Sequence, residues 1–175
     1  AYAEVVRRPR VAILATGDEL LDIDESLLPG KIRNANSYSN AAQVEYLGGI
    51  PIVLGIARDR IEDLTEKIQS GLSRGVDLFL TSGGVSIGDF DLVKTVLAAE
   101  GNINFWRVRM KPGKPLAFGH LTVRESGEHQ TAARKVPILG LPGNPVSAMV
   151  SFEMFARPAI LKMLGFKGFR CIVVD

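Results

Sequence analysis

The 175 residues are enough for one domain with a sizeable core, and 46% of them are hydrophobic and 23% charged, as in ordinary globular proteins. A net charge of +2 is too small to indicate a nucleic-acid partner, and no apolar run approaches the ~20 residues of a membrane span. Cys171 is the single cysteine, which excludes an internal disulfide and a cysteine-based zinc site and fits the reducing cytoplasm.

Short apolar runs bounded by turn residues predict three buried strands, at residues 11–16, 50–56 and 76–80. A helix is predicted after each of them, at residues 36–47, 59–75 and about 91–100. Asn36 and Asp59 are the expected N-caps of the first two helices. Strand–helix order repeated three times at ~30-residue spacing predicts parallel strands joined by helical crossovers.

The second half of the chain has a different pattern. It predicts a strand and then a hairpin, with strands at residues 103–110, 116–123 and 136–141. Asn144 and Pro145 then start an apolar helix, with Asn as the cap and Pro at the first helical position. Pro158 is expected to interrupt this helix, and Gly165 to end it. The predicted fold class is therefore α/β, with a mostly parallel sheet and an antiparallel hairpin.

The two ends of the chain resemble cut points. The chain starts at Ala1 rather than Met, and it ends on the apolar run 171–175, which resembles an unfinished strand. We therefore expect a single domain over residues 1–175, with its core at about 9–165, that forms part of a longer multidomain protein.

The stretch 81–91 joins a predicted strand to a predicted helix, at a junction where open parallel sheets bind ligands. Gly83 and Gly84 carry no Cβ, so backbone N–H groups can approach a ligand, and Ser82 adds a hydroxyl. Together with the positive end of the helix, these groups predict an anion site. Asp89 and Asp91 in the same loop favour a phosphate that arrives with a divalent cation such as Mg²⁺.

A second stretch, 107–114, carries four cations and no acid: Arg107, Arg109, Lys111 and Lys114. Pro112 and Pro115 restrict the backbone, so that Lys111 and Lys114 are presented from a stiffened loop. This stretch predicts a second anion-binding loop, and a solvated basic turn is the alternative.

A third stretch, 140–147, leads from a predicted strand into a helix start, again with free N–H groups. Its candidate substrate-binding residues are Pro142, Asn144, Pro145 and Ser147. Simple helix capping by Asn144 is the other interpretation, and both can hold because a capped helix start can still bind an anion.

Three acids also stand at strand ends or helix starts: Glu19, Asp59 and Asp91. Their carboxylates suit a divalent cation. The structural alternatives are an exposed loop acid for Glu19 and a helix cap for Asp59 and Asp91. His120 and His129 are the only histidines, which excludes a His-rich metal site.

Three motifs in this order resemble the molybdopterin-binding domain of the molybdopterin molybdenumtransferases and of gephyrin. They are Thr81–Asp89, Met110–Pro115 and Gly140–Ser147, and Thr16–Leu20 is similar to the first motif of the same family. The resemblance covers roughly residues 9–165 and implies a three-layer α/β/α domain.

The resemblance implies an enzyme of molybdenum cofactor biosynthesis that inserts molybdate into adenylylated molybdopterin, releases AMP and uses Mg²⁺. The implied catalytic acids and metal ligands are Glu19, Asp59 and Asp91. The implied catalytic cations are Lys111 and Arg107, and the family usually has Lys in place of Arg107. The implied substrate-binding residues are Ser82, Gly83, Gly84, Lys111, Lys114, Pro142, Asn144, Pro145 and Ser147.

The resemblance also implies a homodimer, with the adenylyltransferase of the same pathway as a candidate partner. No nucleic-acid or membrane partner is expected. Two alternatives stay open: the adenylyltransferase of the same fold, which the Lys-Pro-Gly-Lys-Pro sequence disfavours, and a non-catalytic gephyrin-type binding or dimerisation module. Because full-length relatives carry part of the site on other domains, the isolated domain is expected to turn over poorly.

Overall fold

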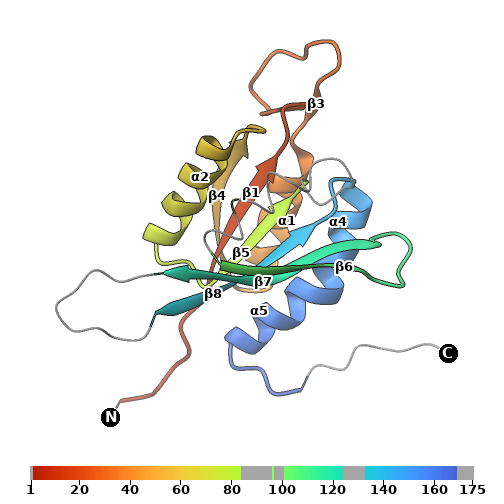
Figure 1. Ribbon diagram of the computed structural model, residues 1–175. Coiled ribbons are helices and arrows are strands. Elements are labelled where there is room, and N and C mark those ends of the chain that lie inside the picture. The colour runs from red at the N-terminus through yellow and green to blue at the C-terminus, as the bar shows by residue number, and fades with distance from the viewer. Residues whose placement is uncertain (1, 84–95, 97–100, 124–132, 169–175) are drawn as a thin grey trace.

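The computed structural model in Figure 1 describes residues 2–83, 96, 101–123 and 133–168. Its central sheet contains β1 (Arg10–Thr16), β4 (Ile50–Ala57), β5 (Leu78–Ser82), β6 (Gly101–Arg107), β7 (Pro115–Val123) and β8 (Arg134–Leu141). The short strands β2 (Leu20–Leu21) and β3 (Ile32–Arg33) pair with each other beyond the end of β1. The helices are α1 (Ala35–Tyr46), α2 (Ile61–Ser73), α4 (Pro145–Ser151), the π-helical turn η1 (Phe152–Ala156) and α5 (Arg157–Met163).

The strand order in the central sheet is β4-β1-β5-β8-β7-β6. β4, β1, β5 and β8 are parallel to one another, whereas β7 runs antiparallel to both β8 and β6. The predicted parallel sheet with an antiparallel hairpin is thus confirmed. None of the helices in the described part of the chain is long and apolar enough to cross a membrane.

The side chains of the central strands alternate between two apolar clusters. In β1, Ala12 and Leu14 face a cluster that includes Leu64 and Ile68 of α2. Val11 and Ile13 face the opposite cluster, which includes residues of α1, α4, η1 and α5. Because β1 is buried on both faces, its sequence is a continuous apolar run, as expected for a central parallel strand. Helices therefore cover both faces of the sheet, and the predicted three layers are confirmed (Figure 1).

Both predicted caps of the first two helices are wrong. Asn34 caps α1, because its side-chain oxygen accepts a hydrogen bond from Ser37 N at 3.2 Å, while Asn36 lies inside the helix. The N-cap of α2 is Arg60, with no side-chain capping bond. Asp59 lies one residue before it and bonds to the backbone of Asp18 instead. Neither predicted residue caps its helix, because each side chain makes a tertiary hydrogen bond instead, Asn36 to Gly143 and Asp59 to Asp18.

Two predicted strands have different bounds. The strand predicted at 76–80 is Leu78–Ser82, because Thr81 and Ser82 continue the ladder with β8. The strand predicted at 103–110 is Gly101–Arg107, because the chain turns into a loop that the bond from Val108 N to Lys114 O closes at 2.8 Å. The third predicted helix lies outside the described residues, except for Val96, which is helical and buried.

The last helical segment confirms the interruption predicted at Pro158. α4 and α5 are separated by the π-helical turn η1, and Pro158 lies in the first turn of α5. Proline cannot donate the backbone bond that a continuous helix would need at this point, so a regular α-helix cannot pass through it. Gly165 then ends α5 with φ +85°, where Phe166 N donates to Leu161 O at 3.1 Å, as predicted.

Asp77 fastens the N-terminal segment to the start of β5. Its carboxylate accepts hydrogen bonds from Arg7 Nη1 at 2.7 Å and from Arg10 N at 2.8 Å. Burial raises the pKa of Asp77, but these hydrogen bonds and the charges of Arg7 and Arg134 outweigh it. The net effect is a pKa below the usual 3.8.

We therefore predict that Asp77→Asn lowers stability at neutral pH by about 1 kcal/mol, the range of a partly exposed ion pair. Because the folded-state pKa lies below the unfolded one, ionised Asp77 stabilises the protein above about pH 4, and this contribution is lost as the pH falls through the folded-state pKa. Thermal melts of both proteins between pH 7 and pH 3 should show melting temperatures that converge in acid. A gap that does not change with pH would contradict this assignment.

Candidate active site

All three predicted glycine-containing loops lie at one edge of the sheet. β5 and β8 are parallel neighbours, with Ser82 paired to Leu141, so the loops that follow them leave the sheet side by side. The second predicted loop, 107–114, joins β6 to β7, where Arg107 pairs with Pro115. Because β7 is antiparallel to β8, the start of β7 lies at the same edge as the end of β8. The prediction that the loops share one edge is confirmed.

The first and third predicted loops touch. A Cβ atom added to Gly143 would lie 3.7 Å from Gly83 Cα, an ordinary van der Waals distance. Gly83 has φ +86°, and a Cβ atom there would lie only 2.5 Å from the carbonyl oxygen of Thr16. The end of β5 can therefore lie against its neighbours only because residue 83 is glycine.

The acids lie on the β4–β1 side of these loops. Gly17 N donates to Ala57 O at 3.1 Å, and this joins the end of β1 to the end of β4. Asp18 and Asp59 then bond reciprocally, each backbone N–H to the other carboxylate, both at 3.2 Å. The exposed Asp59 is thereby fixed beside residue 18.

The exposed carboxylate of Glu19 folds back over Gly17. A Cβ atom on Gly17, whose φ is +138°, would lie 2.2 Å from Glu19 Oε2, so this arrangement also requires glycine. Asp91, the third predicted acid, lies outside the described residues. Within residues 2–83, 96, 101–123 and 133–168, no group of three acidic, histidine or cysteine side chains is placed to hold a metal ion.

The cations lie on the opposite side, in the loop between β6 and β7. Arg107, Lys111 and Lys114 are exposed, and the loop surrounds a hollow of about 630 Å³. Gly113 is buried against α4, because a Cβ atom there would lie 2.7 Å from Ser151 Oγ. The loop is therefore anchored at its middle while its lysines face solvent.

The start of α4 shows the predicted capping. The side-chain oxygen of Asn144 accepts from Ser147 N at 3.2 Å and from Ser147 Oγ at 3.4 Å, and Pro145 begins the helix. Pro142 is buried where β8 ends, and Asn144 is exposed. Capping is thus confirmed, and ligand binding by these residues stays a prediction.

The hydroxyl of Ser82 is the other polar group at this edge. Ser82 is 2% exposed, and its Oγ has no hydrogen-bond partner among the described residues. Buried hydroxyls in folded proteins usually have a partner, and Ser37 Oγ and Ser151 Oγ also lack one among the described residues. The place of Ser82 at the end of β5 makes its hydroxyl a candidate ligand contact. Gly84, the next predicted binding residue, lies outside the described part of the chain.

Two contacts of this edge were missed from the sequence. Asn36 Nδ2 donates to the carbonyl oxygen of Gly143 at 2.7 Å, across 107 residues. Ser151 supports Gly113, as described above. Asparagine is a preferred capping residue, so its type predicts a helix cap at Asn36, and only the tertiary contact reveals its actual partner.

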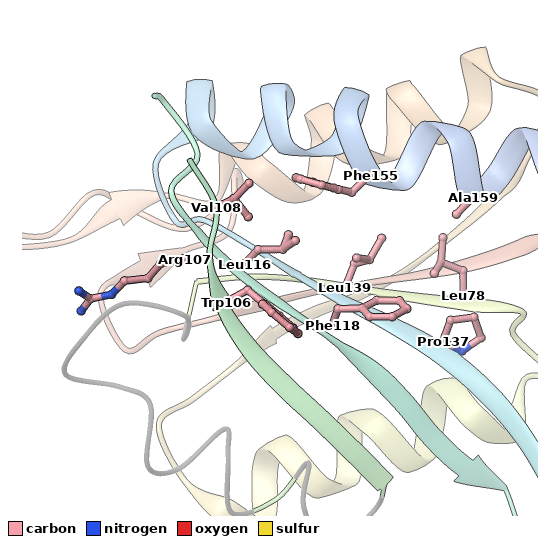
Figure 2. Close-up of a pocket in the computed structure, with 10 residues that line it drawn as sticks. All are labelled: Leu78, Trp106, Arg107, Val108, Leu116, Phe118, Pro137, Leu139, Phe155 and Ala159. Atoms are coloured by element: carbon pink, nitrogen blue, oxygen red, sulfur yellow. The ribbon is translucent and has the colours of Figure 1, made fainter. Parts of the chain in front are cut away.

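An apolar cleft of about 450 Å³ opens beside the cationic loop (Figure 2). Trp106, Phe118 and Leu139 of the strands line one wall, and Phe155 and Ala159 of η1 and α5 line the other. Figure 2 shows the Arg107 side chain pointing away from this cleft. The cleft borders the cationic loop at Arg107 and Val108, but because the Arg107 side chain points away, it lacks the charges that an anion site requires.

The model of the family described as "Probable molybdopterin binding domain" matches residues 12–162, most of the chain. The chain belongs to this family. A molybdopterin molybdenumtransferase of Nostoc sp. is 41% identical to it over 98% of the chain, and gephyrin of Dictyostelium discoideum is 37% identical over 90%. The family resemblance predicted from the motifs is thus confirmed.

A solved structure titled as a molybdopterin biosynthesis moea protein from Pyrococcus horikosii has the same fold, with a TM-score of 0.74 and 31% identity. The alignment covers 91% of the present chain and 36% of that chain. The present chain also spans only 37% of the Nostoc relative and 24% of the Dictyostelium one. The molybdopterin-binding domain is therefore one part of these longer relatives.

We predict that Gly83→Ala destabilises the domain by about 3 kcal/mol or more, because it adds a steric clash to an unfavourable φ. Gly75→Ala is the matched control. Gly75 also has positive φ, at +67°, but a Cβ atom there meets nothing within 4 Å, so the expected cost is about 1 kcal/mol. Urea denaturation of the three proteins measures both values. Equal losses would mean that the approach of Gly83 to Thr16 is not tight.

Proposed function

We propose that this domain carries the site at which molybdate is inserted into adenylylated molybdopterin, with release of AMP. The observation that carries the proposal is the order of groups along one sheet edge. Acids follow β4 and β1, glycine loops follow β5 and β8, and cations occupy the loop between β6 and β7. Relatives named molybdopterin molybdenumtransferase, at 36–41% identity over nearly the whole chain, support this reaction.

The glycine loops would hold the phosphate of the pterin nucleotide. Ser82 offers an unpaired buried hydroxyl, and Gly83 and Gly84 would bring backbone N–H groups close to the phosphate oxygens. On the cationic side, Lys111, Lys114 and Ser147 would hold molybdate. A tetrahedral dianion accepts hydrogen bonds in several directions, so separate point-charge donors suit it better than one planar guanidinium does.

The acids Glu19, Asp59 and Asp91 would hold Mg²⁺. The described pair, Glu19 and Asp59, fits this role, because both carboxylates are exposed at neighbouring strand ends and oxygen ligands suit this ion. A bound Mg²⁺ would neutralise charge on the phosphoanhydride. Asp59 is oriented for its role by the N–H of Asp18.

The proposal includes a homodimer in the cytoplasm, acting after the adenylyltransferase of the same pathway. The single Cys171 and the relatives' role in cofactor biosynthesis support this setting. A purely scaffolding domain of the gephyrin type would not need an exposed cationic loop and an unpaired buried hydroxyl at the same edge of the sheet. Molybdate with Mg²⁺ should therefore raise the melting temperature of this protein, whereas a scaffold should not respond.

We predict that Lys111→Ala and Lys114→Ala each weaken molybdate binding by about tenfold to a hundredfold. A charge-assisted hydrogen bond contributes roughly 1.5–3 kcal/mol, and this corresponds to that range of affinity. Calorimetric titration with molybdate measures the change, and thermal melts check folding. The effect should shrink at high salt if the site is wet.

Lys162→Ala is the matched control for this experiment. Lys162 is exposed on α5, next to Met163, which lies beside Arg7 and Asp77 at the opposite edge of the sheet. Its removal changes the net charge equally and should leave the affinity unchanged. Unchanged affinity in both loop variants would place the oxyanion elsewhere and leave this loop as a basic turn.

We predict that Asp59→Asn raises the Mg²⁺ concentration needed for half-maximal AMP release by the full-length protein about tenfold to a hundredfold. This is the effect expected for the loss of one charged ligand. Asparagine keeps an oxygen that can accept the Asp18 N–H, so the melting temperature should hardly change. Asp18→Asn is the control, because it removes a neighbouring charge that the proposal does not assign to the metal. If both variants behave alike, Asp59 has no special role.

A further inference from the structure

Asn36 of α1 is far in sequence from the glycine loop at Gly143, yet its side chain bonds to that loop. It is 9% exposed, and its Nδ2 donates to Gly143 O at 2.7 Å. A carbonyl oxygen can only accept, so Nδ2 must be the atom that faces it, and the orientation of the amide is settled by this bond. The other amide atom, Oδ1, is buried and has no partner within the described residues.

The bond acts on the peptide unit that begins α4. Gly143 C=O and Asn144 N–H belong to one planar trans peptide, so they point in opposite directions. Because Asn36 holds the carbonyl oxygen toward α1, the Asn144 N–H is held pointing away from α1. Asn144 is also the N-cap of α4, with φ −66° and ψ 126°, so the same peptide sets how that helix starts.

The bond also sets the contact between the two glycine loops. Gly143 is the residue that lies against Gly83, at the van der Waals distance described above. A second amide of α1, Gln43, donates to Glu153 Oε1 of η1 at 3.3 Å. α1 is thus joined to the loop before α4 and to η1 after it, and the Asn36 bond is the one that reaches the site.

We infer that Asn36 is a positioning residue of the anion site: it orients the Gly143–Asn144 peptide and holds Gly143 against Gly83. This inference rests on the function proposed above. Asn36 does not itself contact the anion, and it acts through the backbone of the loop before α4. The same peptide starts α4, whose first turn carries Ser147, one of the residues proposed to hold molybdate. The loss of the Asn36 bond frees this peptide to rotate, so bound molybdate loses a fixed donor while the apolar core stays intact.

The test is calorimetric titration of molybdate into Asn36→Leu and Asn40→Leu. Asn40 is the matched control, because it is a fully buried asparagine one turn further along α1. Its two amide atoms have no partner in the described part of the chain, and neither bonds to a loop of the site. Leucine is close in shape to asparagine, so both variants should fold, and Asn36→Ala serves as a second variant with less bulk.

Asn36→Leu and Asn36→Ala should bind molybdate about five- to tenfold more weakly than the wild type, the effect of one neutral hydrogen bond. Asn40→Leu should keep the wild-type affinity. Asn34→Ala, which removes only the cap of α1, should lower the melting temperature and leave the affinity unchanged. If Asn36 had only a structural role, its replacement would lower the melting temperature without this selective loss of molybdate affinity.

Three different results would overturn the inference. If the wild type and Asn36→Leu bind molybdate equally, the anion site does not depend on this bond, and the proposed function is unaffected. If the wild type itself does not bind molybdate, the proposed function is wrong and this inference is wrong with it. A loss of affinity in Asn40→Leu equal to that in Asn36→Leu would also overturn it, because general packing of α1 would then be the cause.

Discussion

The close approach of β5 to its two parallel neighbours is the constraint on which the site depends. Gly83 lies against the carbonyl oxygen of Thr16 on one side and against Gly143 on the other, at distances that leave no room for a side chain on Gly83. Three consecutive strands, β1, β5 and β8, therefore end together at one edge. A side chain at residue 83 would separate these ends and, with them, the groups that they present.

The charged residues of the proposed site are arranged by sign along this edge. The acids follow the two strands on one side of β5, and the cations lie in the hairpin loop on the other side. Among the described residues, no ion pair joins these acids to the cations of the β6–β7 loop, so both remain available to a ligand that carries a cation and anionic groups. Lys31 and Arg58 also lie on the acidic side, where each donates to the carbonyl oxygen of Asp18. The packing behind the edge is apolar on both faces of the sheet and holds these positions without using the charged groups.

The support behind the loops is polar and specific. Asn36 bonds to the loop just before α4, and Gln43 bonds to Glu153 of η1 just after it. Gly113 of the cationic loop packs against Ser151 of α4. One short helix thus contacts two of the three loops. Its position is set by hydrogen bonds that have a direction, whereas apolar contacts alone would allow it to slide.

The sequence alone determined the order of the six central strands and of the described helices, the three motifs and their family, because apolar periodicity, glycine positions and capping at Asn144 are local signals. It missed the short strands β2 and β3. It did not determine which asparagine caps α1: Asn34 and Asn36 are equivalent locally, and only α4 packing beside α1 gives Asn36 its partner 107 residues away. Asp59 likewise matched a capping pattern, yet the parallel pairing of β1 with β4 placed Asp18 within its reach. Sequence patterns report on neighbours along the chain. The partners of Asn36 and Asp59 lie far away in sequence, so only the tertiary structure decides that these side chains bond there instead of capping a helix.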